Sequence, residues 1–132
     1  MSKVLSVFSM RAVAYIRVST KEQDELVQLN AIQDFAKKRG VELVRVYIDK
    51  GESGAKPFMQ RPQARTLLEE LGTFKPEALI CWSLDRLGRT MLDTLNTVQE
   101  LENKGCKVIT VKEEWLQSMD DSIRRLVLSV LS

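Results

Sequence analysis

Hydroxyl and guanidinium side chains meet in one short stretch of this sequence. In AYIRVSTKEQ (14–23) an apolar run ends at Arg17, and Ser19 follows two positions later. Successive side chains of a strand point to opposite faces, so this spacing places Arg17 and Ser19 on one side of a strand end. A cation held beside a hydroxyl suits the binding of an anion that the hydroxyl can attack.

Further arginines occur in segments far from this one. DRLGR (85–89) carries Arg86 and Arg89 three positions apart, on one face if the segment turns helically. Arg61 follows KGESGAKPFMQ (50–60), which is expected to be a mobile loop because it holds two glycines and a proline. Arginine binds phosphate oxygens in a two-point geometry. A serine surrounded by arginines therefore suits attack on a phosphodiester, with the cations stabilising the charge that builds on the phosphoryl oxygens.

Each of these residues also has a purely structural explanation. Ser19 and Glu22 form the S-x-x-E pattern of a capping box at a helix start. A buried guanidinium is costly without a partner, so Arg17 can be explained by a salt bridge to Asp49 or Asp85. The same two aspartates, or an arginine acting as a donor, are the candidates for general acid and base. The chain contains no histidine, the commonest general base.

The structural explanation of the other arginines is a solvated surface. Arg61 would then be an ordinary charge at a helix start, where the helix dipole makes a cation slightly unfavourable. Several separate segments that deliver arginines around one serine favour a functional site over chance.

Strand and helix patterns alternate along the chain. Strands are expected at 10–18, 41–49, 77–84 and 107–112, and helices at 21–39, around 64–72, from about 90 to 105 and from about 120 to the end. Gly40, Gly72 and Gly105 are expected to end the first three helices. Asp120, Asp121 or Ser122 is expected to cap the last helix. The alternation predicts an α/β fold with a mostly parallel central sheet of about four strands flanked by helices, and a site beyond the carboxyl ends of the strands.

Bulk properties exclude several classes of protein. The length of 132 residues fits one domain, and the net charge of +2 is too small to indicate a nucleic-acid partner by itself. Cys81 and Cys106 lack metal-ligand spacing and are interpreted as packed free thiols of a reducing compartment. Arg11 interrupts the apolar start, so no signal peptide is expected, and no apolar run is long enough to span a membrane. We expect a cytoplasmic protein.

YIRVSTKEQ followed by DRLGR on alternating strands and helices resembles the catalytic domain of the serine recombinases, the resolvase/invertase family. The resemblance extends from Met10 through YIDKGESG and RPQARTLLEEL to almost the end of the chain. It implies a site-specific DNA recombinase in which the serine forms a 5′-phosphoserine linkage and releases a 3′-hydroxyl, followed by strand exchange and religation. It also implies double-stranded DNA as the partner, a homodimer that forms a tetramer at paired sites, and no metal or cofactor.

The resemblance also assigns roles to residues. It makes Ser19 the nucleophile, and it makes Arg17, Arg61, Arg86 and Arg89 the active-site arginines. Asp49 and Asp85 would orient those arginines, and Gln23 and Gln28 would lie beside the nucleophile. By the same resemblance, residues 1–9 are an extension, 10–119 the catalytic domain and 120–132 the start of a long dimerisation helix, with the DNA-binding domain outside this chain.

Two other interpretations stay open. The chain could be an inert relative that serves as a DNA-architecture or dimerisation module, which predicts gaps among the site residues. It could also be an unrelated flavodoxin-type or receiver-type domain that binds a phosphorylated small molecule. That class expects a glycine-rich loop after the first strand or an acidic cluster for Mg²⁺, and RVSTKEQ offers neither.

Overall fold

A four-stranded parallel sheet organises this protein, of which a computed structural model describes residues 10–18, 22–51, 56–114 and 120–131. The strands are β1 (Met10–Val18), β2 (Val41–Lys50), β3 (Ala78–Cys81) and β4 (Lys107–Thr110). Their order in the sheet is β2-β1-β3-β4, and every neighbouring pair is parallel. The predicted α/β fold with a parallel sheet is confirmed.

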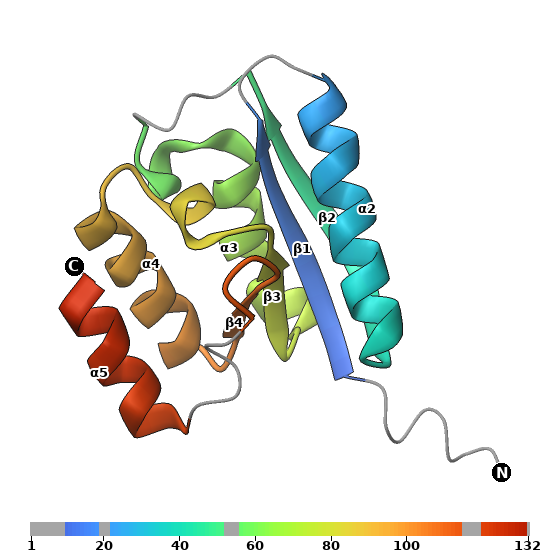
Figure 1. The fold of residues 1–132 in the computed structure, drawn as a ribbon. Helices are drawn as coiled ribbons and strands as arrows, with labels where there is room; N and C mark the ends of the chain where they lie inside the picture. The colour runs from blue at the N-terminus through green and yellow to red at the C-terminus, as the bar shows by residue number, and fades with distance from the viewer. Residues whose placement is uncertain (1–9, 19–21, 52–55, 115–119, 132) are drawn as a thin grey trace, which may run out of the picture.

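Helices cover both faces of this sheet. Helix α2 (Glu22–Lys38) lies on one face, and α3 (Pro62–Phe74) and α4 (Met91–Asn103) lie on the other (Figure 1). Alternate residues of β1 pack against the helices on the two opposite faces of the sheet. Ala12, Ala14 and Ile16 pack in the α2 layer, whereas Val13 and Tyr15 pack in the layer of α3 and α4. Residues 12–18 are all buried, as expected for a central strand of a parallel sheet.

Helix α5 (Asp121–Leu131) packs on the outside of α4 (Figure 1). Arg124 is 3% exposed, with Nη1 2.8 Å from a carboxylate oxygen of Glu102 and Nη2 donating to the carbonyl oxygen of Val108 at 2.9 Å. The expected cap is Asp120, whose Oδ1 accepts from the backbone N–H of Ile123 at 3.0 Å. A buried ion pair thus fixes the last described helix to the body of the domain.

Several predicted boundaries were wrong. The third strand ends at Cys81 rather than at residue 84, because the chain leaves the sheet there and Leu84 starts a 3-10 helix, η2 (Leu84–Leu87). The fourth strand likewise ends at Thr110. Helix α3 passes through Gly72 and ends at Phe74, whose carbonyl oxygen accepts from Arg11 Nη1 at 2.8 Å. Burial of the apolar face of α3 outweighs the cost of about 1 kcal/mol for a glycine in a helix.

Part of the predicted loop 50–60 is ordered core. Residues Phe58–Gln60 form a second 3-10 helix, η1, and Phe58 is completely buried, with its ring 5.0 Å from that of Tyr15. The helix ends at Gly40 and Gly105 are confirmed, since both glycines have positive φ and are the second residue after a helix. Cys81 and Cys106 are buried free thiols, as predicted. Among the described residues, no helix combines the length and apolar character needed to cross a bilayer.

Candidate active site

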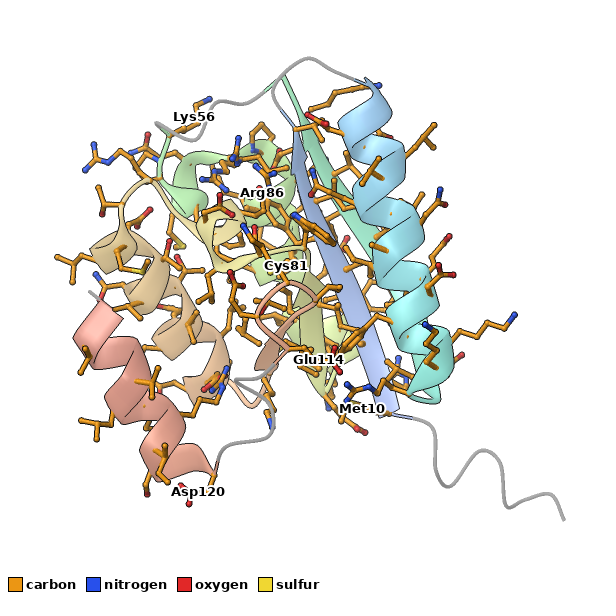
Figure 2. The ribbon with its side chains drawn as sticks, viewed as in Figure 1. Met10, Lys56, Cys81, Arg86, Glu114 and Asp120 are labelled. Atoms are coloured by element: carbon orange, nitrogen blue, oxygen red, sulfur yellow. The ribbon has the colours of Figure 1, made fainter. Side chains whose placement is uncertain are left out.

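The carboxyl end of the sheet gathers the charged residues that the sequence singled out. Arg17 near the end of β1 pairs in register with Asp49 near the end of β2. Figure 2 shows Lys56 and Arg86 at this end of the molecule, with Met10 and Asp120 at the opposite end. The prediction that the site lies beyond the carboxyl ends of the strands is therefore supported by where these arginines and aspartates lie.

Asp49 joins three elements at this end. Its Oδ1 accepts from the backbone N–H of Gln63 at 2.8 Å, and its Oδ2 accepts from the N–H of Ala64 at 3.0 Å and from the hydroxyl of Tyr15 at 2.9 Å. A carboxylate at a helix start satisfies N–H groups that have no partner inside the helix and interacts well with the helix dipole. Asp49 is 2% exposed and acts as the cap of α3.

Arg61 is the most deeply placed arginine of the site. It precedes α3 and is completely buried, which excludes the surface explanation. Its Nε donates to the carbonyl oxygen of Lys56 at 3.0 Å, and its Nη1 donates to Tyr15 at 3.3 Å and to the carbonyl oxygen of Arg86 at 2.5 Å. A buried Arg61 therefore connects β1, the chain before η1 and the segment that carries Arg86.

The DRLGR segment turns helically over only part of its length. Arg86 lies in η2, but the backbone is extended at Gly88 (φ −171°), so Arg89 is not on the same helical face. The side chain of Arg89 is exposed, while its backbone N–H donates to Asp93 Oδ2 at 2.6 Å. Asp85 is exposed and its carboxylate accepts from the hydroxyl of Ser83. The condition for one shared face, a helical turn through both Arg86 and Arg89, is not met because η2 ends at Leu87.

Gly88 is required by close packing. A Cβ at this position would lie 2.5 Å from the backbone nitrogen of Thr94 and 2.7 Å from its hydroxyl. Glycine thus lets the segment rest directly on the first turn of α4.

Arg17, Arg61 and Arg86 form a cation cluster, here called the arginine cluster. Burial lowers the pKa of Arg17, and the charges of Arg86 and Arg61 lower that pKa further, whereas Asp85 opposes the shift. Such mutual repulsion is relieved when an anion binds between the guanidinium groups. Beside the cluster, Gln28 is 2% exposed and its Nε2 donates to the carbonyl oxygen of Arg17 at 3.1 Å. Gln28 therefore fixes the backbone at the end of β1.

Two predicted site residues are not described structurally. Ser19 and the side chain of Gln23 lie outside the described residues, as does the capping box of Ser19 and Glu22.

Tyr15 is a site residue that sequence reasoning missed. It is fully buried, donates to Asp49 and accepts from Arg61, so its hydroxyl connects a capping carboxylate to a cluster arginine. Burial raises the pKa of this hydroxyl, which stays protonated and able to donate. The strand alternation that pairs Arg17 with Ser19 also pairs Tyr15 with Arg17, and that signal could have identified it.

The fold of this chain is similar to that of solved catalytic domains of serine recombinases. The N-terminal catalytic domain of TP901-1 integrase aligns with a TM-score of 0.77 and 28% identity, over 92% of both chains. The C-terminal catalytic domain of ISC1926 TnpA, an IS607-like serine recombinase, aligns with a TM-score of 0.68 and 26% identity, over 92% of this chain and 78% of that one.

Sequence relatives agree. The family model described as Resolvase, N terminal domain, matches residues 12–132, and the chain therefore belongs to the resolvase family as a recombinase catalytic domain. A resolvase of Clostridium perfringens is 32% identical over 91% of this chain and 59% of its own length. A DNA-invertase of Escherichia phage P1 is 38% identical over 70% of this chain and 44% of its own length. The chain thus spans about half the length of these relatives.

Proposed function

We propose that this domain cuts and rejoins DNA in site-specific recombination, with Ser19 as the nucleophile. The observation that carries the proposal is the arginine cluster, in which three chain segments place Arg17, Arg61 and Arg86 at the carboxyl end of the strand that leads into Ser19. A phosphodiester is an anion that this cluster can bind.

The proposed reaction is a phosphoryl transfer. The Oγ of Ser19 forms a bond to a DNA phosphorus, the bond from phosphorus to the 3′-oxygen breaks, and Ser19 keeps the 5′-phosphate as an ester. The serine proton leaves to a base, and a proton is added to the departing 3′-oxygen. Rejoining is the reverse, after the subunits have exchanged strands. The guanidinium groups stabilise the extra negative charge on the phosphoryl oxygens, and we propose that they do so without a metal ion.

The contacts of the two aspartates suggest different roles. Both oxygens of Asp49 already accept hydrogen bonds, two of them from the backbone of α3. Transfer of a proton to Asp49 would disrupt those bonds, so we assign Asp49 to holding Arg61 and α3 in place. Asp85 is exposed, and its charge favours the ionised form of Arg17. Of the two, Asp85 is the better candidate for moving a proton.

We further propose double-stranded DNA and a second copy of the protein as partners, with pairs of dimers forming the tetramer that exchanges strands. Helix α5 would be the start of the dimerisation helix, and residues 1–9 an extension ahead of the catalytic domain. Support comes from the apolar side chains of Ile123, Leu126 and Val130, which are 49%, 64% and 77% exposed on α5. Exposed apolar stripes of this kind mark surfaces that are covered by another chain.

The test is to trap the covalent intermediate. The natural full-length protein is incubated with fragmented DNA of its source, denatured, and examined for protein attached to 5′-ends. The modified peptide is then mapped. We expect the adduct at Ser19, the same yield in EDTA, and no adduct from Ser19→Ala. Thr73→Ala removes an exposed hydroxyl near the end of α3 and serves as the matched control, with an unchanged adduct.

A folded protein that binds the DNA but forms no adduct would contradict the proposal. The interpretation as an inert architectural module would then replace it. An adduct at another residue, or an adduct that survives Ser19→Ala, would refute the assignment of the nucleophile.

A further inference from the structure

The first residue of η2, the 3-10 helix that carries Arg86, is held by a hydrogen bond to a residue from another part of the chain. Ser83 precedes η2, the usual position of a capping serine, yet its side chain does not cap the helix and its hydroxyl donates to Asp85 instead. The first N–H of η2, on Leu84, donates to Oε1 of Glu113 at 3.0 Å. Glu113 thus supplies the acceptor that the local sequence does not.

Glu113 reaches this position through the backbone. Beyond the end of β4, the N–H of Val111 donates to the carbonyl oxygen of Cys81 at 3.0 Å, and the N–H of Lys112 donates to that of Trp82 at 2.8 Å. The parallel alignment of β3 and β4 therefore continues past both strands and ends with Glu113 opposite Leu84. Burial raises the pKa of the Cys81 thiol, and the negative charges of Glu113 and Asp85 raise it further.

The other side of the segment is equally well defined. Arg61 donates to the carbonyl oxygen of Arg86 at 2.5 Å, and Leu84 and Leu87 are buried in the core. Within the described residues, the Nε atom of Arg86 is buried and has no hydrogen-bond partner. No hydrogen bond of Nε therefore holds the guanidinium, and its position follows that of the backbone of η2. A shift of η2 would move Arg86 directly.

We propose that Glu113 is a positioning residue for the reaction, which sets Arg86 and Asp85 in place by accepting the hydrogen bond of Leu84. This inference rests on the proposed function. The role depends on the reach of the acceptor oxygen, not on its charge. Misplacement of a catalytic group by about 1 Å can cost roughly 100-fold in rate, so a single backbone hydrogen bond is enough to matter.

Two conservative variants separate reach from charge. Glu113→Gln keeps an acceptor oxygen at the same distance and loses the charge. Glu113→Asp keeps the charge and shortens the side chain by one methylene. Glu114→Ala is the matched control, because Glu114 is the neighbouring glutamate, is exposed and pairs with Arg39 away from η2.

The measurement is the single-turnover rate of Ser19 adduct formation by the full-length protein at saturating DNA, together with its apparent DNA affinity. We expect Glu113→Gln and Glu114→Ala to stay within about threefold of wild type, and Glu113→Asp to fall by about 10- to 100-fold at unchanged affinity. Amide exchange at Leu84 should be faster in Glu113→Asp only. That readout follows the hydrogen bond itself and applies even where activity is lost for another reason.

Three results would overturn the inference. Equal rates in both variants would show that the contact does not matter. A slow Glu113→Gln with a normal Glu113→Asp would show that the charge acts, as in proton transfer. Unchanged amide exchange at Leu84 in both variants would show that the hydrogen bond from Leu84 to Glu113 does not protect this amide. If wild type forms no Ser19 adduct, it is the proposed function that fails, and the amide exchange still reports on the hydrogen bond.

Discussion

Replacement of Asp49 should damage this protein more than most single changes. Asp49→Ala leaves the N–H groups of Gln63 and Ala64 and the hydroxyl of Tyr15 without their acceptor, at a position that is 2% exposed. Water has little access to such a site, so the lost hydrogen bonds are not replaced. The same change removes a negative charge from the start of α3.

The magnitude follows from those contacts. A hydrogen bond to a charged group contributes about 1.5–3 kcal/mol, and the loss of a helix cap costs about 0.5–2 kcal/mol. Because the contacts share one carboxylate and are not additive, we expect the free energy of unfolding to fall by about 3–5 kcal/mol. Domains are commonly stable by only about 5–15 kcal/mol. Asp49→Asn should cost nearly as much, since its amide group has a single acceptor oxygen and presents N–H groups to the remaining donors.

Urea unfolding followed by tryptophan fluorescence measures this loss, and the slope m shows whether the unfolded state has changed. Asp34→Ala is the control, because Asp34 is exposed on α2 and should change stability by no more than about 0.5 kcal/mol. A loss below about 1 kcal/mol for Asp49→Ala, at unchanged m, would show that the cap carries little energy. The argument for Asp49 as the residue that holds Arg61 and α3 would then fail.

Three further predictions concern other parts of the fold. Glu102→Gln should lower the free energy of unfolding in urea by about 2–4 kcal/mol because it leaves Arg124 buried without a countercharge. The double variant Glu102→Gln with Arg124→Met should recover part of that loss. An equal loss of stability in the single and the double variant would contradict a coupled pair. Phosphate should raise the melting temperature of wild type more than that of Arg86→Gln at matched ionic strength, because an anion relieves repulsion in the arginine cluster; equal shifts would show that the anion binds elsewhere. Burial raises the pKa of the Cys106 thiol to about 12. The contribution of the protonated thiol to the free energy of unfolding is therefore fully present below about pH 9, the ordinary thiol pKa, and is lost as the pH rises towards 12. The thiol should resist alkylation at pH 8 in the folded protein, and rapid labelling would refute this.

The sequence was sufficient for the architecture and for the end of the sheet at which Arg17, Asp49 and Arg86 lie. The apolar run over β1, the helical periods and the glycines at residues 40 and 105 specified a parallel sheet with its charged residues at one end. Arg17, Asp49 and Arg86 lie at that end because parallel strands deliver their carboxyl ends to one edge.

The misses have a common physical origin. Trp82 and Leu84 extend the apolar pattern of β3, but burial in a 3-10 helix needs the same apolar residues as burial in a strand. Gly72 was interpreted as a helix end, although packing of α3 overrides local propensity there. The roles of Tyr15 and Glu113 depend on hydrogen bonds between segments that lie far apart in the chain. Such contacts leave no periodic signal.

The hydrogen bonds of Arg61 also determine when the arginine cluster can form during synthesis of the chain. Its guanidinium bonds a hydroxyl 46 residues upstream and a carbonyl 25 residues downstream, so the arginine cluster cannot close until the chain has been made through Arg86. At a synthesis rate of about 5–20 residues per second, several seconds pass between the appearance of Ser19 and the completion of the cluster. A growing chain therefore contains residue 19 and Arg17 before Arg61 and Arg86 have been added, and the reaction proposed above requires those later segments.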